Sequence, residues 1–264
     1  MSKKKDAAEF AKDIAGNEKA LLGWNFTTLG YFDYIAARQL IINGSLLAGV
    51  VLASTSIEKY LKALLAYTGK KTHVHLDSLG LPDLLRKNGI DVGEYLNENF
   101  LSYLGRAYAF RYIEPMDSAA SIAIEQWKLL AELDYSIHTL DGTLNFGGAI
   151  KTNYQIALQA KTDALFADNY LLTGQPKSEF IERSALAFAI ANRPNTEIMQ
   201  MTIPKLKALN DGNFDFPVVN YGGNQVEINF GRKASEVEFE IPLSKPEADG
   251  KTDDGMGKRA HPAV

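Results

Sequence analysis

The stretch SLLAGVVLASTSIEKYLKALLAY, residues 45–67, decides the fold class of this chain. Its apolar residues recur every three or four positions, and Ser54 lies on the same stripe as Leu47, Val50, Ile57, Leu61 and Leu64. Residues with this spacing lie on one face of an α-helix. The stretch therefore predicts a long helix with one buried face.

Similar patterns on both sides of this stretch predict further helices joined by short loops. The pair Asn43-Gly44 is a helix stop, Pro82 and Asp83 are typical of a helix start, and Asp117 is a candidate cap. The predicted helices cover residues 8–22, 26–42, 45–67, 82–87, 94–112 and 117–140. Short connections favour antiparallel neighbours, so we expect an up-and-down antiparallel helical bundle over residues 1–145.

The second half is predicted to be a smaller α+β region, residues 146–244. Residues 151–172 and 178–192 have helical patterns. After Asn210 the period changes to two, which predicts a hairpin over 218–230 and a strand over 236–241 in a short antiparallel sheet. Residues 245–264 carry almost nothing to bury and are predicted to be a flexible tail. The whole chain is thus predicted to be mainly α.

Composition narrows the classes of function. The chain has 264 residues and a net charge of −4, and residues 1–150 and 151–264 each contribute −2. This even distribution of charge argues against a basic nucleic-acid-binding arm. Any phosphate binding therefore has to come from a local cluster of basic residues. The absence of cysteine excludes disulfides, thiol nucleophiles and iron–sulfur clusters, and it fits a cytoplasmic protein. No cofactor is expected.

Two segments resemble targeting or membrane signals but lack what those signals need. Lys3, Lys4 and Lys5 are followed by Asp6 instead of an apolar run. Residues 39–57 are uncharged, yet Asn43-Gly44-Ser45 and Ser54-Thr55-Ser56 interrupt them. A spanning helix needs about 20 predominantly apolar residues. We therefore expect two helices that meet at a tight turn, and no membrane partner.

The order of motifs in the first half resembles the HEPN domain (higher eukaryotes and prokaryotes nucleotide-binding). NGSLLA at 43–48 joins two helices, and SIEKYLKALL at 56–65 is similar to the family pattern A-x-E-x-x-L-K-A-L-L. HL at 75–76 is similar to the stretch before the third helix, and residues 104–112 end in the family's R-Y. The resemblance covers about residues 26–140.

This resemblance implies an all-helical bundle that binds RNA or a nucleotide and forms a homodimer. Many members of the family are metal-independent endoribonucleases in toxin–antitoxin or phage-defence systems, with an R-x(4–6)-H motif. This chain lacks the motif, because no histidine follows Arg106 or Arg111 at that spacing. Members without it are generally binding or scaffolding domains.

Two groups of residues are the candidates for contacting RNA or a nucleotide. Arg106 and Arg111 lie close to Tyr108 and Tyr112 in the sequence. The arginines could bind a phosphate, and the tyrosine rings could stack against a base. Otherwise these arginines are surface residues that pair with carboxylates such as Glu58 or Glu114.

The second group is Glu58, Lys62 and His75. Glu58 and Lys62 are four residues apart and either form a helix-stabilising ion pair or place Glu58 to orient an arginine. His75 either contacts a nucleotide or buttresses the following helix. The pair His73 and His75 lacks a third nitrogen or sulfur ligand, so no metal site is predicted.

Three functions remain open at this point. The leading hypothesis is a HEPN-like protein that binds RNA or a nucleotide or scaffolds a partner. The second is an endoribonuclease with a displaced catalytic set, in which Arg111 acts with His75 or Glu58. The third is a pure protein-interaction module that uses an edge strand at 236–241.

Overall fold

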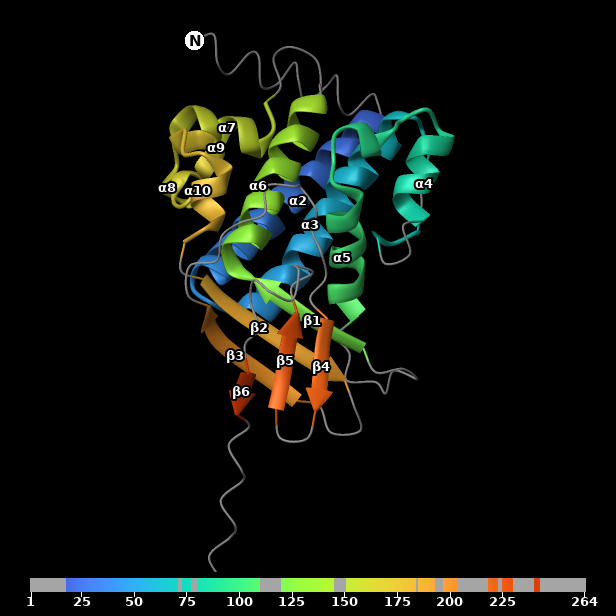
Figure 1. Ribbon diagram of the computed structural model, residues 1–264. Coiled ribbons are helices and arrows are strands. Elements are labelled where there is room, and N and C mark those ends of the chain that lie inside the picture. Colours follow the sequence, from blue (N-terminus) through green and yellow to red (C-terminus); the bar gives the residue numbers. More distant parts are fainter. Residues whose placement is uncertain are drawn as a thin grey trace, which may run out of the picture.

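A computed structural model describes residues 18–70, 73–76, 80–109, 120–144, 151–183, 185–192, 197–203, 218–222, 225–229 and 240–242 (Figure 1). The described part is mainly helical, which confirms the predicted class. Its longer helices are α2 (Glu18–Ile42), α3 (Leu46–Tyr67), α5 (Glu98–Ala109) and α6 (Gln126–Thr143). The short ones are α4 (Gly80–Lys87), η2 (Val92–Glu94), α7 (Asn153–Ala160), α8 (Asp163–Phe166), α9 (Tyr170–Thr173) and α10 (Lys177–Ile181).

Helices α2 and α3 form an antiparallel hairpin. The start of α2 lies beside the end of α3, because a methyl group added at Gly69, two residues after α3, would lie 2.5 Å from Lys19. In the middle of the pair, a methyl group at Gly30 would lie 2.9 Å from Tyr60. Near the turn, a methyl group at Gly49 would lie 2.6 Å from Ile41. The two helices therefore pack with almost no space at Gly30 and Gly49, where only a glycine fits. Across the same contact the Ser56 hydroxyl donates to the Gly30 carbonyl at 2.8 Å.

The uncharged stretch 39–57 contains the turn of this hairpin. As predicted, α2 ends at Ile42 and α3 begins at Leu46, with the turn at Asn43-Gly44-Ser45. Gly44 has a positive φ of 82°, which suits glycine at a helix end. None of the described helices combines the length and the apolar character that crossing a membrane requires.

One hydrophobic core runs through the helical part, and α3 supplies much of it. The fully buried residues of α3 include Val50, Ile57 and Leu61. Residues after 150 join the same core, since Tyr154, Leu165, Tyr170 and Phe180 are buried in it. Figure 1 shows the short helices α7 to α10 gathered beside α6 and α2, at the side of the bundle away from α4.

The described strands are β1 (Ala120–Glu125), β2 (Ala185–Asn192), β3 (Glu197–Ile203), β4 (Val218–Gly222), β5 (Gln225–Asn229) and β6 (Glu240–Pro242). They pair antiparallel in the orders β1-β2-β3 and β4-β5-β6. Strands β4 and β5 lie within the predicted hairpin 218–230. Most of the predicted strand 236–241 and the tail lie outside the described residues.

Two helix predictions are wrong over part of their length, because some of the residues form paired β-strands instead. The helix predicted over 117–140 begins only at Gln126, and Ala120–Glu125 is a strand. Likewise 178–192 divides into α10 and strand β2, which pairs with β1 and β3. Alanine favours helices, but the large residues of β2 alternate with alanines, which is the period of a strand. Pairing across the sheet decides between the two.

Other predicted helices differ mainly in their boundaries. The helices predicted at 8–22 and 26–42 are continuous from Glu18 to Ile42, and the earlier residues lie outside the description. The helix predicted over 94–112 is described as Glu98–Ala109. Lys161 and Asp168 have positive φ values of 50° and 48°, and they divide the predicted helix 151–172 into short helices.

A fully buried ion pair joins three parts of the helical core. The Arg38 guanidinium on α2 donates to the Asp134 carboxylate on α6, which also accepts from the Tyr34 hydroxyl at 2.8 Å. Arg38 donates further to the carbonyl oxygens of Ala164, at 3.3 Å, and Ala167. Arg38 thus ties the α8 segment to both α2 and α6.

Asp141, near the end of α6, is a second buried carboxylate, and none of its described partners is a cation. It accepts hydrogen bonds from the Thr152 hydroxyl at 2.8 Å and the Tyr60 hydroxyl at 3.3 Å. Burial raises the pKa of Asp141 to about 6, although the hydrogen bonds from Thr152, Tyr60 and Gln155 oppose the shift. The folded protein therefore stabilises the protonated form of Asp141 relative to the charged form.

This gives a stability prediction with a defined sign. Because the folded-state pKa lies above the unfolded value, the protonated Asp141 stabilises the fold below about pH 4, and that contribution disappears as pH rises through about 6. The loss amounts to about 3 kcal/mol by pH 7.5. Asp141→Asn keeps one acceptor and carries no charge, so we expect it to be more stable than the wild type at pH 7.5.

Urea unfolding of both proteins from pH 4 to pH 8 checks this prediction. The difference in unfolding free energy should favour Asp141→Asn at high pH and shrink or reverse near pH 4. A difference that does not change with pH would contradict the assignment of a raised pKa to Asp141.

Candidate functional site

The structure brings three of the predicted site residues together, namely Glu58, Lys62 and His75, which we call the Glu58 cluster. Glu58 and Lys62 lie one turn apart on α3, at the border between its buried stripe and its outer face. Lys62 Nζ lies 2.7 Å from Glu58 Oε1, and His75 Nδ1 lies 3.0 Å from the same oxygen. The predicted ion pair between Glu58 and Lys62 is present.

The segment after α3 brings His75 into this cluster. The Leu76 amide donates to Glu58 Oε2 at 3.2 Å, and the Leu76 side chain is buried. Glu58 thus binds the backbone beside His75 as well as the imidazole ring. The side chain of Glu58 is only 16% exposed, whereas that of His75 is 59% exposed. The cluster therefore has a mostly buried carboxylate and an exposed imidazole.

The environment of Glu58 favours its charged form. Burial by itself would raise its pKa, but the hydrogen bond and charge of Lys62, the His75 hydrogen bond and the Leu76 amide outweigh burial. The pKa of Glu58 is lowered as a result. A carboxylate on Nδ1 holds an imidazole in one tautomer and orientation, with Nε2 left for a ligand. This arrangement can donate or accept a proton at one defined atom.

The arginine–tyrosine group is only partly described. Arg106 is exposed on α5 and Tyr108 on the same helix is partly exposed. Arg111 and Tyr112 lie outside the described residues, so their predicted place beside Arg106 stays a prediction. Within the described part of the chain, the Glu58 carboxylate accepts from Lys62, the His75 ring and the Leu76 amide.

The other two described histidines, His73 and His138, do not join the cluster. His73 is exposed, and the neighbouring Asp77 lies outside the described part. His138 on α6 lies with Nδ1 2.9 Å from the hydroxyl oxygen of the buried Tyr154. In the part of the chain that the structure describes, no group of three or more carboxylates and histidines is arranged to hold a metal ion.

Sequence reasoning missed an open cavity of about 390 Å³ between α3, the loop after α4, and α6. Its apolar wall contains Leu64, Ile90, Val92, Leu96 and Leu140. Asp91, Tyr95, Thr139 and Thr143 provide polar atoms. These residues come from three segments far apart in the chain, at residues 64, 89–96 and 139–143, so no local pattern indicates that they meet.

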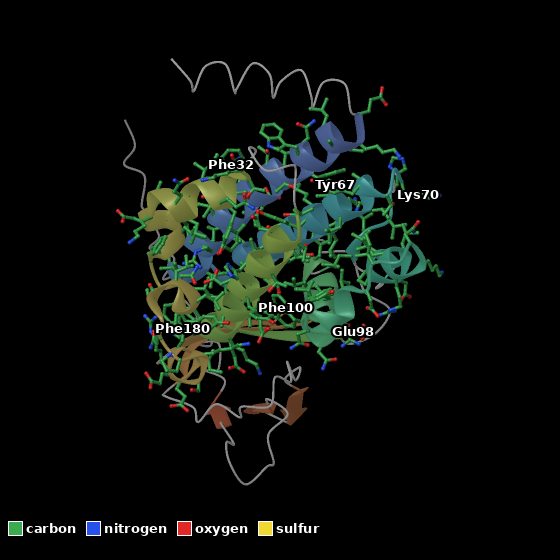
Figure 2. The ribbon with its side chains drawn as sticks, turned by 90° about the horizontal axis from the view of Figure 1, so that it is seen from above. Phe32, Tyr67, Lys70, Glu98, Phe100 and Phe180 are labelled. Atoms are coloured by element: carbon green, nitrogen blue, oxygen red, sulfur yellow. The ribbon has the colours of Figure 1, made fainter. Side chains whose placement is uncertain are left out.

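Sequence reasoning also missed an apolar outer face on α2. Phe32 is 60% exposed, Leu29 is 53% exposed, and Leu21 is also exposed. The other exposed positions of this face after Leu21 are Asn25, Ala36 and Gln39, none of which is charged. Figure 2 shows Phe32 at the outside of the helical layer, on the opposite side of the molecule from Glu98. We call this surface the α2 face.

Comparison with known protein families, curated proteins and solved structures finds no match for this chain. The resemblance to the HEPN domain therefore rests on the sequence motifs at 43–48, 56–65, 75–76 and 104–112.

The structure predicts what Glu58→Gln does to stability. The lowered pKa means that the Glu58 carboxylate stabilises the fold above its unfolded-state value of about 4.3 and loses this effect as pH falls through the folded-state pKa. Glutamine cannot satisfy Lys62, His75 and Leu76 together. We expect Glu58→Gln to lower the free energy of unfolding by about 1 kcal/mol at pH 7.

Chemical denaturation at pH 7 and pH 3.5 measures this effect, with Glu98→Gln as the control for an exposed carboxylate. The Glu58→Gln deficit should shrink as the pH falls from 7 to 3.5, and Glu98→Gln should change less at pH 7. Equal effects of the two substitutions at pH 7 would show that the Glu58 cluster contributes no more than a surface ion pair.

Proposed function

We propose that this chain is a HEPN-like protein that binds RNA or a nucleotide, in a cytoplasmic setting such as prokaryotic defence or a toxin–antitoxin pair. The observation that carries the proposal is the Glu58 cluster, where the motif residues Glu58 and Lys62 meet His75. In this proposal Arg111 and Arg106 hold the phosphate, Tyr108 and Tyr112 stack the base, and His75 adds a donor at the edge of the site.

The charges in the Glu58 cluster explain why the arginines are needed. Glu58 and Lys62 neutralise each other, so the cluster alone attracts a phosphate only weakly. The role of Glu58 here is to position His75 and Lys62. Binding strength comes from Arg111 and Arg106, and replacing Arg111 should weaken binding while leaving the buried core intact.

A second function, metal-independent endoribonuclease, is favoured by the hydrogen bond between Glu58 and the imidazole. In such a reaction His75 takes the proton of a ribose 2′-hydroxyl, the 2′-oxygen forms a bond to phosphorus, and the bond from phosphorus to the 5′-oxygen breaks. The leaving 5′-oxygen takes a proton from water, and the product ends in a 2′,3′-cyclic phosphate. Arg111 would stabilise the charge on the phosphoryl oxygens.

The two functions predict different results with end-labelled RNA. Wild type, Arg111→Ala, His75→Ala and Glu58→Gln are incubated with RNA, with and without EDTA, and analysed by denaturing gel and by filter binding. The control is His73→Ala, which removes an exposed histidine two residues from His75. For the binding function we expect retention of intact RNA that falls at least about tenfold in Arg111→Ala, falls less in His75→Ala and Glu58→Gln, and is unchanged in His73→Ala.

Cleavage that resists EDTA, yields cyclic phosphate ends and needs both His75 and Arg111 would establish the endoribonuclease instead. Unaltered binding by Arg111→Ala would contradict the assignment of that residue. Neither binding nor cleavage by the wild type would reject both nucleic-acid functions and leave the protein-interaction module.

We also propose that the chain forms a homodimer, as the family resemblance implies, and that the α2 face lies in the interface. An uncharged face can meet its own copy without opposing like charges, and large exposed apolar groups such as Phe32 and Leu29 mark interaction surfaces. A charge placed there should oppose association.

Light scattering after size exclusion tests this arrangement with Phe32→Glu. We expect a dimer for the wild type and a dissociation constant at least about tenfold higher for Phe32→Glu. Tyr135→Glu is the control, because it places the same charge at an exposed aromatic on α6. A Phe32→Glu protein that remains a dimer, or a monomeric wild type, would contradict this interface.

A further inference from the structure

The cavity between α3, the loop after α4, and α6 has the chemistry of a binding site for a small organic cation. Its inner wall is apolar, with Leu64, Val92, Leu96 and Leu140 almost completely buried. At its edge the Tyr95 ring is 49% exposed and the Asp91 carboxylate is 45% exposed. A ligand that fits this wall has an apolar body and one polar end.

The charges near the cavity decide the sign of that polar end. Arg86 is a cation that contacts the lining residue Asp91, and three carboxylates surround it: Asp83 at 2.8 Å, Glu98 at 2.7 Å and Asp91 at 3.5 Å. This group carries a net charge of −2. None of the described lining residues is a lysine, an arginine or a histidine. The cavity therefore disfavours a phosphate and favours a cation.

Asp91 can receive such a cation without losing its own structural role. Its Oδ1 accepts the Gly93 amide at 3.0 Å and so caps η2, while its contact with Arg86 is long. A planar amidinium or guanidinium can pair with a carboxylate through two N–H groups and lie against an aromatic ring. Tyr95 provides that ring at the same edge of the cavity.

We propose that this cavity binds a small amphipathic cation of the amidinium or guanidinium class, with its charged end on Asp91 and its apolar body against Leu64, Leu96 and Leu140. The site shares no residue with the Glu58 cluster and does not rest on the proposed function. The cation is either a free metabolite with a guanidinium group or an arginine side chain from another protein, and both present the same group to Asp91.

Calorimetric titration of the full chain with benzamidine and with benzamide tests the proposal, because these probes share shape and differ in charge. We expect benzamidine to bind at least about tenfold more tightly than benzamide. Asp91→Asn, which keeps the Oδ1 cap, should remove that preference. Arg86→Gln should have the opposite effect and tighten benzamidine binding, because it removes the cation that competes for Asp91.

The control variant is Asp83→Asn. It removes the same charge from the same group, but Asp83 does not line the cavity. We expect it to change benzamidine affinity by no more than about threefold. Equal loss in Asp83→Asn and Asp91→Asn, equal affinity for both probes, or no binding of benzamidine would each overturn the proposal.

Agmatine and an N-acetyl, C-amide arginine peptide then separate the two sources of the cation. Tighter binding of agmatine indicates a free metabolite, and tighter binding of the peptide indicates an arginine of a protein partner. Binding of neither, together with binding of benzamidine, would overturn the guanidinium assignment.

Discussion

The buried pair of Arg38 and Asp134 is the constraint on which the helical core depends. A charge removed from water costs several kcal/mol unless a partner and hydrogen bonds compensate it. Here the partners come from α2, α6 and the α8 segment, whose carbonyl groups at Ala164 and Ala167 also accept from Arg38. Any other relative position of these three elements would leave a buried charge unpaired. The pair therefore selects one arrangement among the many that apolar contacts alone would allow.

That arrangement gives α3 a fixed position between α2 and the rest of the bundle. Gly30 and Gly49 allow α2 and α3 to pack closely, and Tyr60 of α3 donates to Asp141 at the far end of α6. Glu58 lies within this rigid segment, so its carboxylate has little freedom. The imidazole of His75 is consequently positioned by a group that cannot easily move, which is what a binding or proton-transfer site requires.

The sequence predicted the features that depend on local pattern. The hairpin around Asn43-Gly44-Ser45, the buried stripe of α3 and the pair of Glu58 and Lys62 all arise from spacing within one or two helices. The meeting of Glu58 with His75 depends on a chain reversal after α3. The strand at 120–125 and the cavity at Asp91 depend on segments far apart in the chain. A local pattern does not show which distant segments pair, and the alanines of β2 favoured a helix although its large residues alternate with the period of a strand.

The two candidate sites differ in the burial and charge balance of their carboxylates. This difference means that each site favours a different kind of ligand. Glu58 is mostly buried and its charge is already balanced by Lys62, so it positions its neighbours and has no net charge to offer a ligand. Asp91 is half exposed in a group whose cation is outnumbered by carboxylates, so its charge is available at the edge of an apolar cavity. A phosphate at the Glu58 cluster and an organic cation at Asp91 would therefore not compete for the same place.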